Sequence, residues 1–458
     1  MSPIAPGTKT AVMFPGQGAY LPGSLSDVQR DDRAAQVVGE VLEEVDKAAA
    51  AAGTAAVSPL LTERSAPAVD TLVQGDPERL HLAIYAASLA SYKVLTGPLG
   101  LSPDVVFGHS VGELTALVAG GALSIADGAR LLAARDAAFR DAPPVPGGIY
   151  PVPRGAGRPA RLVEGCGLAR TRIAADNAPR QAVVSGPDDE LDALARVLDA
   201  LGLRHFRLRS AHPFHSPLLA PVVARFRPAV SEVEVSVPHL PVYSPTCGGY
   251  YRDVDEIRDA VVHHLVQPVA FRQAVTTLYG DGIDRFVETG PKSILADLVA
   301  QCLPDASAVA PLRSRVGFTG LRAALAGDSS GPVLSAVADA VGDVAVEDEP
   351  DASATTVKAE VTKPKPKPKA GGLPDRGTLI EELRALYAEE LEYPLDVMAP
   401  DADLEADLAV DSVKQIELFS RALDRYGLPQ PEAALRVTTY TTLERVAGLL
   451  GDIAGGLR

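Results

Sequence analysis

Short apolar runs alternate with amphipathic stretches over the first 325 or so residues of the chain. Residues 10–14 and 105–108 are mainly apolar and are followed by turn residues, which is typical of buried strands. Residues 28–52 and 77–97 have helical periodicity, and another helical pattern begins just after the second apolar run. Strands that alternate with helices in this way predict an α/β fold with a largely parallel sheet.

The pattern shortens between about residues 147 and 209. Its pieces indicate strand, helix, strand, strand, helix and strand, the βαββαβ order of a ferredoxin-like fold. In chain order they cover residues 149–152, 159–164, 170–174, 181–185, 188–201 and 205–208. We therefore expect a compact subdomain inserted into the larger α/β domain.

The remainder of this domain is expected to add strands and a closing helix. Strands are predicted at residues 233–237, 242–245 and 285–288, and a helix over residues 293–303. Beyond about residue 327 the periodicity weakens. Lysine and proline then alternate over residues 363–369, which favours an extended chain and predicts a semi-rigid linker.

The C-terminal segment, residues 376–458, has the apolar spacing of a small helical domain. Helices are expected over residues 378–391, from about residue 412 and from about residue 441. A plain four-helix bundle would explain this spacing, and so would a more specialised helical domain.

Composition narrows the functional classes. The 458 residues carry a net charge of −16, which argues against a nucleic-acid partner. No apolar run approaches the roughly 18 residues of a membrane span, and the N-terminus does not resemble a signal peptide. The three cysteines are too few and too scattered for a metal site or a disulfide framework. We expect a cytoplasmic protein without metal.

The segment from Gly108 to Gly112 joins the second apolar run to a helical pattern and has the form Gly-x-Ser-x-Gly. This strand–turn–helix context is typical of a nucleophile elbow. The hydroxyl of Ser110 would then lie at a helix N-terminus, where backbone N–H groups can stabilise an oxyanion. A chance match is the alternative in a chain with 40 glycines.

Two other loops are candidates for the same site. The Gly-Gln-Gly turn at residues 16–18 follows the first predicted strand, and its backbone could supply a second oxyanion donor. His212 and His215 lie in a loop directly after the predicted subdomain. A loop histidine beside a serine elbow is a candidate general base, although a lone histidine is more often structural.

Eight motifs in one order resemble the acyltransferases that load acyl carrier proteins. These are malonyl-CoA:acyl carrier protein transacylases and the acyltransferase domains of polyketide synthases, and the similarity covers roughly residues 10–325. The resemblance implies an α/β-hydrolase-like core with the inserted ferredoxin-like subdomain. The motifs are Phe14-Pro15-Gly16-Gln17-Gly18, Gly108-His109-Ser110-Val111-Gly112-Glu113, Ala122-Leu123-Ser124, the Arg135 helix, Asn177-Ala178-Pro179-Arg180-Gln181, Phe214-His215-Ser216, Gln267-Pro268-Val269 and Glu288-Thr289-Gly290-Pro291.

The resemblance also implies a role for each candidate. Ser110 would be the nucleophile that takes the acyl group from a coenzyme A thioester. His215 would accept the serine proton and later activate the incoming thiol. The backbone N–H groups of Gln17 and Val111 would form the oxyanion hole, and the carbonyl of His264 would orient the imidazole of His215.

Further resemblances concern the acyl group. Arg135 resembles the arginine that binds the free carboxylate of a malonyl unit through two hydrogen bonds, whereas a solvated helix arginine is the alternative. Phe214 and His212 would border the acyl pocket, in a form close to that of malonyl-specific members. Tyr20 and His81 differ from the residues usual at these positions in the family. Both positions could border the acyl pocket, so the substrate could also be a substituted malonyl unit.

Residues 404–417 resemble acyl carrier proteins, most of all the tandem carriers of polyunsaturated-fatty-acid synthases. This resemblance implies an all-α four-helix carrier domain. Ser412 would hold covalent 4′-phosphopantetheine, attached by a phosphopantetheinyl transferase.

The sequence thus predicts an acyltransferase domain (residues 1–327, with the subdomain at 147–209), a linker (328–375) and an acyl carrier domain (376–458). A malonyl-type unit would pass from malonyl-CoA, or a related acyl-CoA, to the arm on Ser412 or on a partner carrier. A ketosynthase or another synthase domain would use it in polyketide or fatty-acid-like biosynthesis. The alternatives are an editing acyl hydrolase and a carrier scaffold with an inactive acyltransferase domain. The sequence leaves open the exact acyl group, the pathway, loading in cis or in trans and the oligomeric state.

Overall fold

The chain forms two compact units in the computed structural model, Met1–Gly327 and Asp328–Arg458. The structure describes residues 8–152, 155–201, 212–313, 317–326, 373–391, 398–402, 404, 410, 412–428 and 440–454.

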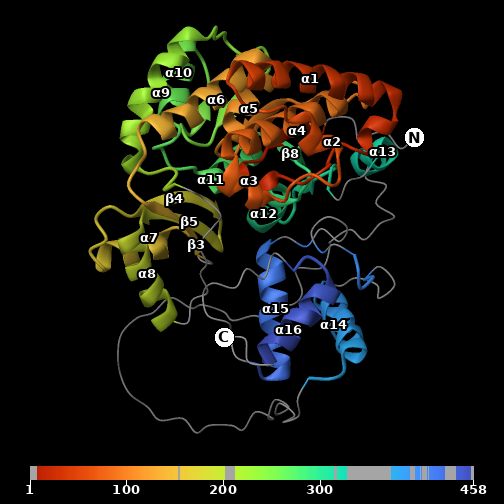
Figure 1. Cartoon of the computed structure of the whole chain (residues 1–458). Helices are drawn as coiled ribbons and strands as arrows, with labels where there is room; N and C mark the ends of the chain where they lie inside the picture. Colours follow the sequence, from red (N-terminus) through yellow and green to blue (C-terminus); the bar gives the residue numbers. More distant parts are fainter. Residues whose placement is uncertain are drawn as a thin grey trace. The chain divides into compact units, whose positions relative to one another are not determined.

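The first unit, which runs from β1 to α13 and includes the labelled helices α1 to α13 in Figure 1, contains a six-stranded sheet with the order β7-β6-β2-β1-β8-β9. All neighbours pair in parallel except β6 and β7. Since β1, β2 and β8 are adjacent and parallel, the loops that follow them meet at one edge of the sheet. The strands are β1 (Lys9–Phe14), β2 (Val105–Gly108), β6 (Val242–Ser244), β7 (Gly249–Tyr250), β8 (Ile283–Glu288) and β9 (Ser307–Val309).

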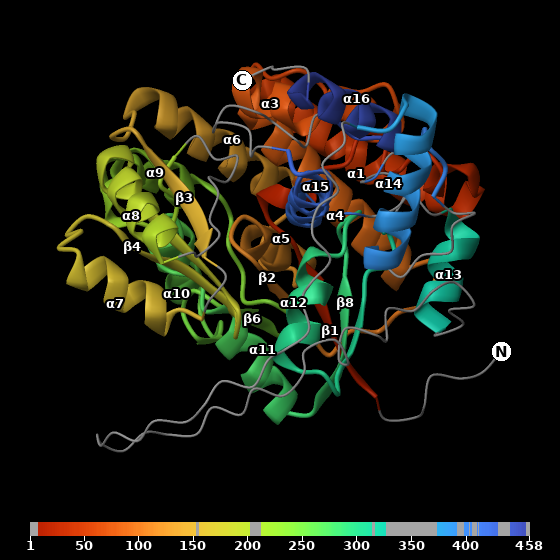
Figure 2. The same cartoon turned by 90° about the horizontal axis from the view of Figure 1, so that it is seen from below.

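Alternate residues of these strands belong to two separate apolar cores. Val12 and Val106 pack into a core with α1, α4, α6, α9 and α10, whereas Met13 and Phe107 pack into a core with α11 and α12. The sheet therefore has helices on both faces (Figure 2), as expected for an α/β fold. These helices are α1 (Asp32–Ala51), α4 (Pro77–Thr96), α6 (Ile125–Asp141), α9 (Ala220–Glu232), α10 (Val254–His263), α11 (Phe271–Gly280) and α12 (Ile294–Cys302).

A smaller antiparallel sheet with the order β3-β5-β4 forms the inserted subdomain. Two helices accompany it, and Val152, Val184 and Leu194 belong to its separate apolar core. This is the βαββα part of the predicted ferredoxin-like arrangement; the last predicted strand, at residues 205–208, lies outside the described residues. The elements are β3 (Gly147–Val152), α7 (Gly157–Gly165), β4 (Arg172–Ala178), β5 (Gln181–Pro187) and α8 (Asp188–Ala200).

One predicted strand is wrong. Residues 233–237 form an extended segment outside any sheet, in which Ser236 donates its N–H to the carbonyl of Ala122 and Val237 is 56% exposed. Alternating valines favour extended backbone, but a strand also needs a ladder partner and a face to bury. The helix predicted from residue 28 begins at Asp32 instead, because Val28–Arg30 forms a 3₁₀ turn and Asp31 caps the helix.

The remaining described elements of the first unit are short helices and turns. They are the 3₁₀ turns Gln17–Ala19 and Pro217–Leu219, together with α2 (Ser58–Thr62), α3 (Val69–Gly75), α5 (Gly112–Ala119) and α13 (Phe318–Ala326).

The second unit packs three described helices around one apolar core. Leu383 and Tyr387 of α14 meet Leu418 of α15 and Leu450 of α16, and each of these side chains is buried. Residues 328–372, most of the predicted linker at 328–375, and residues 429–439 are outside the described residues. The helices are α14 (Arg376–Leu391), α15 (Ser412–Tyr426) and α16 (Leu443–Ala454).

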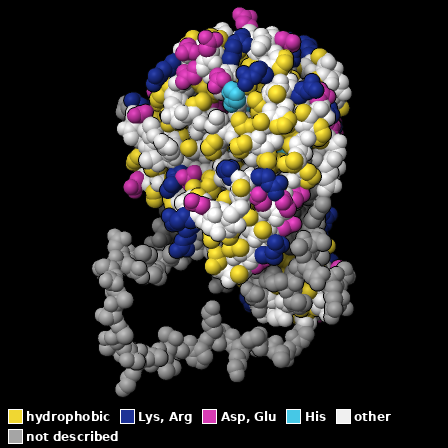
Figure 3. All heavy atoms as spheres, turned by 90° about the vertical axis from the view of Figure 1, so that its left-hand side faces the viewer, with side chains coloured by type: hydrophobic (Ala, Val, Ile, Leu, Met, Phe, Trp, Pro, Cys, Tyr) yellow, Lys and Arg dark blue, Asp and Glu magenta, His cyan; other side chains and the backbone are white. Residues whose placement is uncertain are grey.

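One face of the molecule mixes charges of both signs (Figure 3). On the face shown in Figure 3, acidic and basic side chains are interspersed with hydrophobic and neutral ones. The acidic excess of the chain is therefore not concentrated on this face. None of the helices that the structure describes is long and apolar enough to cross a membrane.

Candidate active site

Ser110 lies in the sharp turn between β2 and α5, with a φ of 55°. The two flanking glycines are required by close contacts. A methyl group on Gly112 would overlap the carbonyl of Phe14, and one on Gly108 would overlap the backbone of Gly112. The turn thus packs directly against the end of β1, where His109 also donates its N–H to Phe14 over 2.9 Å.

The structure brings Ser110 and His215 together. The Nε2 atom of His215 is 2.8 Å from the Oγ atom of Ser110. The Nδ1 atom of His215 is 2.9 Å from the carbonyl oxygen of Gln267 and 3.1 Å from that of His264. Because carbonyl oxygens can only accept hydrogen bonds, Nδ1 carries the proton in the neutral ring. Nε2 then accepts a hydrogen bond from the serine hydroxyl.

Both residues have strained backbone. Among the described residues, Ser110 and His215 are the two non-glycine residues with positive φ, 55° and 57°. Such conformations cost on the order of 1–3 kcal/mol each and persist where surrounding structure holds them, often at active sites. The fully buried Ser216 contributes to this by accepting the N–H of Leu218 in the next turn.

Burial lowers the pKa of the His215 imidazole to about 4, the charges of His109 and Arg135 act in the same direction, and the two backbone carbonyls oppose the shift. His215 is therefore neutral at physiological pH. A neutral imidazole that accepts the serine proton has the state required of a general base.

This shift predicts an acid-resistant acylation step. Activity should fall only as the pH drops through about 4, where His215 becomes protonated and can no longer accept a proton, rather than near the ordinary value of 6.5. The measurement is kcat/KM for acyl-enzyme formation against pH, since this parameter reports groups of the free enzyme. Circular dichroism at each pH separates titration from unfolding. An inflection near 6.5 in folded protein would contradict the proposed environment of His215.

The two proposed oxyanion donors belong to segments beside Ser110. Val111 is the N-cap residue of α5, where N–H groups have no partner within the helix. Gln17 begins a 3₁₀ turn after β1. The preceding Gly16 packs on the elbow, because a methyl group there would lie 3.0 Å from the carbonyl oxygen of His109 and 3.5 Å from the Cβ atom of Ser110. Two loops therefore reach the nucleophile from adjacent parallel strands.

His109, next to Ser110 in the chain, faces the subdomain. Its Nε2 atom donates to the side-chain oxygen of Asn177 in β4 over 2.8 Å, and its ring lies against Phe271. Burial lowers the pKa of His109. These contacts are those of a structural histidine that connects the elbow to the smaller sheet.

A cavity of about 320 Å³ lies beside Gln17 and is lined by His81, His212 and Phe214, among others. The imidazole of His212 stacks on the ring of Phe139, with centroids 4.3 Å apart. The structure therefore places both Phe214 and His212 on a cavity wall. Tyr20 is instead buried in the apolar core, where its hydroxyl donates to the carbonyl of Pro67 over 3.0 Å.

Arg135 is only 3% exposed, so the alternative of a solvated arginine is wrong. Its Nε and Nη2 atoms donate to one carboxylate oxygen of Asp136, over 3.2 and 3.1 Å. The second oxygen of Asp136 is 2.7 Å from Nδ1 of His81. Sequence reasoning did not find Asp136, because an aspartate next to an arginine on a helix ordinarily points elsewhere.

Glu113 was also missed. It is buried in the first turn of α5, and its carboxylate accepts hydrogen bonds from the hydroxyls of Tyr251 (2.6 Å), Thr246 (2.8 Å) and Ser244. Burial raises the pKa of Glu113, although these hydrogen bonds oppose the shift. The network ties the helix of the elbow to β6 and the turn that follows it.

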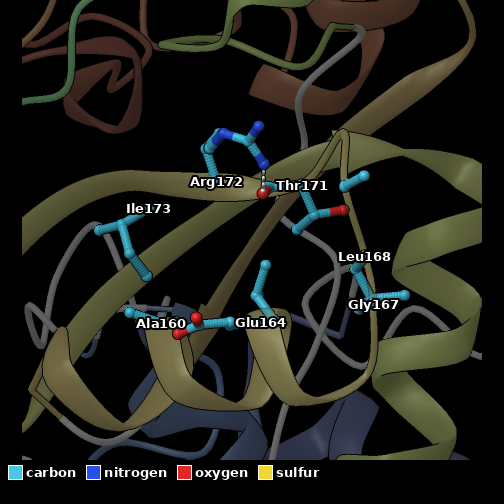
Figure 4. Close-up of a pocket in the computed structure, with 9 residues that line it drawn as sticks. Ala160, Glu164, Gly167, Leu168, Thr171, Arg172 and Ile173 are labelled. Atoms are coloured by element: carbon cyan, nitrogen blue, oxygen red, sulfur yellow. Dashed lines mark hydrogen bonds between the residues drawn. The ribbon is translucent and has the colours of Figure 1, made fainter.

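A larger cavity of about 470 Å³ lies in the subdomain between α7 and β4 (Figure 4). Its lining is mainly apolar and includes Val163, Leu168 and Ile173, while Arg172 donates to the carbonyl of Thr171 over 2.7 Å. None of the residues that line it belongs to the Ser110–His215 pair. Size alone therefore does not identify the chemical site.

In the second unit, Ser412 is the first residue of α15. From the same helix, the Nε2 atom of Gln415 donates to the carbonyl of Val410 over 2.8 Å. A phosphodiester on Ser412 would lie at a helix N-terminus, where N–H groups and the helix dipole favour an anion. The described residues thus fit a 4′-phosphopantetheine group on this serine.

Comparison with known proteins assigns the class of each unit. The acyl transferase domain family matches residues 12–317, well over half of the chain, so the chain belongs to that family. Residues 381–450 match the phosphopantetheine attachment site family. The protein therefore joins an acyltransferase to a carrier domain for covalent 4′-phosphopantetheine. The family and fold classes predicted from the motifs are confirmed.

Individual relatives agree with this assignment. The polyketide synthase GfsB of Streptomyces halstedii is 36% identical over 225 residues, which are 49% of this chain and 4% of that protein. The malonyl CoA-acyl carrier protein transacylase of Bacillus subtilis is 27% identical over 299 residues, or 64% of this chain and 90% of that enzyme. The crystal structure of malonyl-CoA:acyl carrier protein transacylase from Xanthomonas oryzae superposes with a TM-score of 0.61 at 27% identity, covering 70% of this chain and 97% of that one.

Proposed function

We propose that the protein transfers a malonyl-type acyl group from coenzyme A, through an ester on Ser110, to a carrier-bound thiol. The observation that carries the proposal is the pairing of Ser110 with the neutral, carbonyl-held His215. The buried guanidinium of Arg135 and the cavity beside Gln17 support a carboxylated acyl group.

In the first half-reaction, the Oγ atom of Ser110 attacks the thioester carbonyl carbon while Nε2 of His215 takes the hydroxyl proton. The N–H groups of Gln17 and Val111 would stabilise the oxyanion. When the carbon–sulfur bond breaks, His215 returns the proton to the sulfur of coenzyme A. The acyl group is then an ester on Ser110.

In the second half-reaction, His215 takes the proton of an incoming thiol, whose sulfur attacks the ester carbonyl carbon. The bond to Ser110 breaks, and His215 returns the proton to the serine oxygen. When attached, 4′-phosphopantetheine supplies this thiol on a flexible arm. Ser412 would hold the arm, or a partner carrier would.

The same acyl-enzyme would give a hydrolase if water replaced the thiol. Product partition tests this point. The pantetheinylated chain is incubated with labelled malonyl-CoA, and protein-bound malonyl thioester is compared with free malonate over time. Predominant thioester supports transfer, and predominant malonate supports the editing hydrolase. No consumption of any acyl-CoA would support an inactive scaffold, against the assembled Ser110–His215 pair.

The partners remain part of the proposal. A phosphopantetheinyl transferase would attach the arm, and a ketosynthase or another synthase domain would use the loaded acyl group in the cytoplasm. Two relatives are named as a polyketide synthase (GfsB) and as a malonyl CoA-acyl carrier protein transacylase (the Bacillus subtilis protein). These relatives support polyketide or fatty-acid-like biosynthesis as the setting.

Arg135→Ala should reduce the use of malonyl-CoA far more than that of acetyl-CoA. The variant loses a charge-assisted contact worth roughly 2–4 kcal/mol and leaves the Asp136 carboxylate to repel the substrate. The measurement is kcat/KM with both thioesters. Arg130→Ala is the matched control, because Arg130 is on the same helix but pairs with Asp127. Equal losses with both thioesters would assign Arg135 to the fold alone.

A further inference from the structure

The carboxylate of Asp136 lies between the buried side chains of Arg135 and His81. One of its oxygens accepts from Nε and Nη2 of Arg135, and the other is 2.7 Å from Nδ1 of His81. All three side chains are less than one-tenth exposed. His81 belongs to α4 and the other two to α6, so the contact joins neighbouring helices, and His81 and Asp136 line the cavity beside Gln17.

The geometry divides the guanidinium of Arg135 into two edges. Asp136 occupies the Nε–Nη2 edge, which leaves the Nη1–Nη2 edge for a second carboxylate. His81 holds the far oxygen of Asp136, and this contact keeps the carboxylate turned toward Arg135. The arginine is thus fixed before any substrate arrives, which reduces the entropy cost of binding.

The contacts of Asp136 with Arg135 and His81 also set the charge beside the guanidinium. Burial alone would raise the pKa of Asp136, but the charges of Arg135 and His81 and the hydrogen bonds to both hold it below its usual value. Asp136 is therefore ionised, and Arg135 and Asp136 together carry no net charge. The Asp136 carboxylate therefore offsets the charge of Arg135 and repels a substrate carboxylate that approaches the guanidinium.

The surrounding groups come from several other elements. The charges of Asp136, His81 and Arg135 act on the pKa of His212. The charge of Arg135 also lowers the pKa of His215 and that of His264. Arg140 and Glu78, which also line the cavity, pair with each other over 2.5 Å and together carry no net charge. Arg135 therefore lies within electrostatic reach of the Ser110–His215 pair.

We propose that Asp136, held by His81, is a specificity-determining positioning residue: it fixes the Nη1–Nη2 edge of Arg135 for the acyl carboxylate and weakens the preference for carboxylated over uncarboxylated acyl groups. This inference rests on the proposed function, since it concerns the acyl group that Ser110 receives. It implies a site that accepts malonyl-type units without strictly excluding neutral acyl groups of similar size.

The test compares Asp136→Asn, Asp136→Ala and the wild type with malonyl-CoA and acetyl-CoA, measuring kcat and KM for acyl-enzyme formation. Asparagine keeps an acceptor for Arg135 but removes the charge. The preference for malonyl-CoA should rise about tenfold through a lower KM, because like charges a few ångströms apart in a buried site interact with at least that strength. Alanine also removes the acceptor, so its preference should fall below that of the wild type.

Asp127→Asn is the matched control. It makes the same change on the same helix, at a carboxylate that pairs with Arg130, and should leave the preference unchanged. An unchanged or lower preference in Asp136→Asn would overturn the proposal. Equal behaviour of the asparagine and alanine variants, or an equal change in the control, would do so too. A wild type that forms no acyl-enzyme with either thioester would instead refute the proposed function itself.

Discussion

His215→Ala is expected to slow acyl transfer by roughly 10²–10⁴-fold, the usual contribution of a general base. The imidazole accepts a hydrogen bond from the Ser110 hydroxyl over 2.8 Å and is oriented by two backbone carbonyls, so it is placed to take the serine proton. The loss should appear in kcat for both half-reactions, because the base acts on the serine proton first and on the thiol proton later.

His212→Ala is the matched control from the same loop. Its ring stacks on Phe139 at the cavity wall, so the variant should mainly change which acyl group is accepted. Steady-state rates of both variants with malonyl-CoA and acetyl-CoA decide the matter. If His212→Ala lost most of its acyl-transfer rate while His215→Ala kept its rate, the assignment of His215 as the base would be wrong.

Ser412→Ala is expected to abolish attachment of 4′-phosphopantetheine while Ser110 can still be acylated. The two serines belong to separate compact units, each with its own apolar core. Intact-mass measurement after treatment with a phosphopantetheinyl transferase reports the first effect, and labelling with radioactive malonyl-CoA reports the second. Ser420→Ala, on the same helix, should be modified like the wild type.

Two outcomes would contradict this prediction. Undiminished attachment in Ser412→Ala would place the arm on another residue. Loss of Ser110 labelling in the same variant would show that the acyltransferase unit depends on the carrier unit.

The helices and strands of the core were largely predictable, because their signal is local. The glycines at 108 and 112 indicate a tight, closely packed turn, and the structure shows the backbone contacts that exclude any side chain there. The N-cap of α6 depends on a local contact of the same kind, since the hydroxyl of Ser124 accepts the N–H of Asp127 over 3.0 Å. The resemblance to family motifs then identified His215 as the candidate base, whereas residue chemistry alone did not decide between His212 and His215.

The missed residues act through contacts that local patterns do not encode. Asp136 contacts both its neighbour Arg135 and His81, which lies 55 residues earlier in the chain. Glu113 is satisfied by hydroxyls that lie more than 130 residues away. The extended residues 233–237 failed as a strand for the same reason, since strand formation depends on a partner that the segment itself does not specify.

The central claim is that the acyl group passes through Ser110 on its way to the carrier. It is tested most directly by incubating the pantetheinylated wild type and Ser110→Ala with malonyl-CoA and locating the malonyl group by peptide mass spectrometry. The wild type should carry malonyl as an ester on Ser110 and as a thioester on the arm at Ser412, whereas Ser110→Ala should carry neither. An arm loaded equally well in Ser110→Ala would contradict the account.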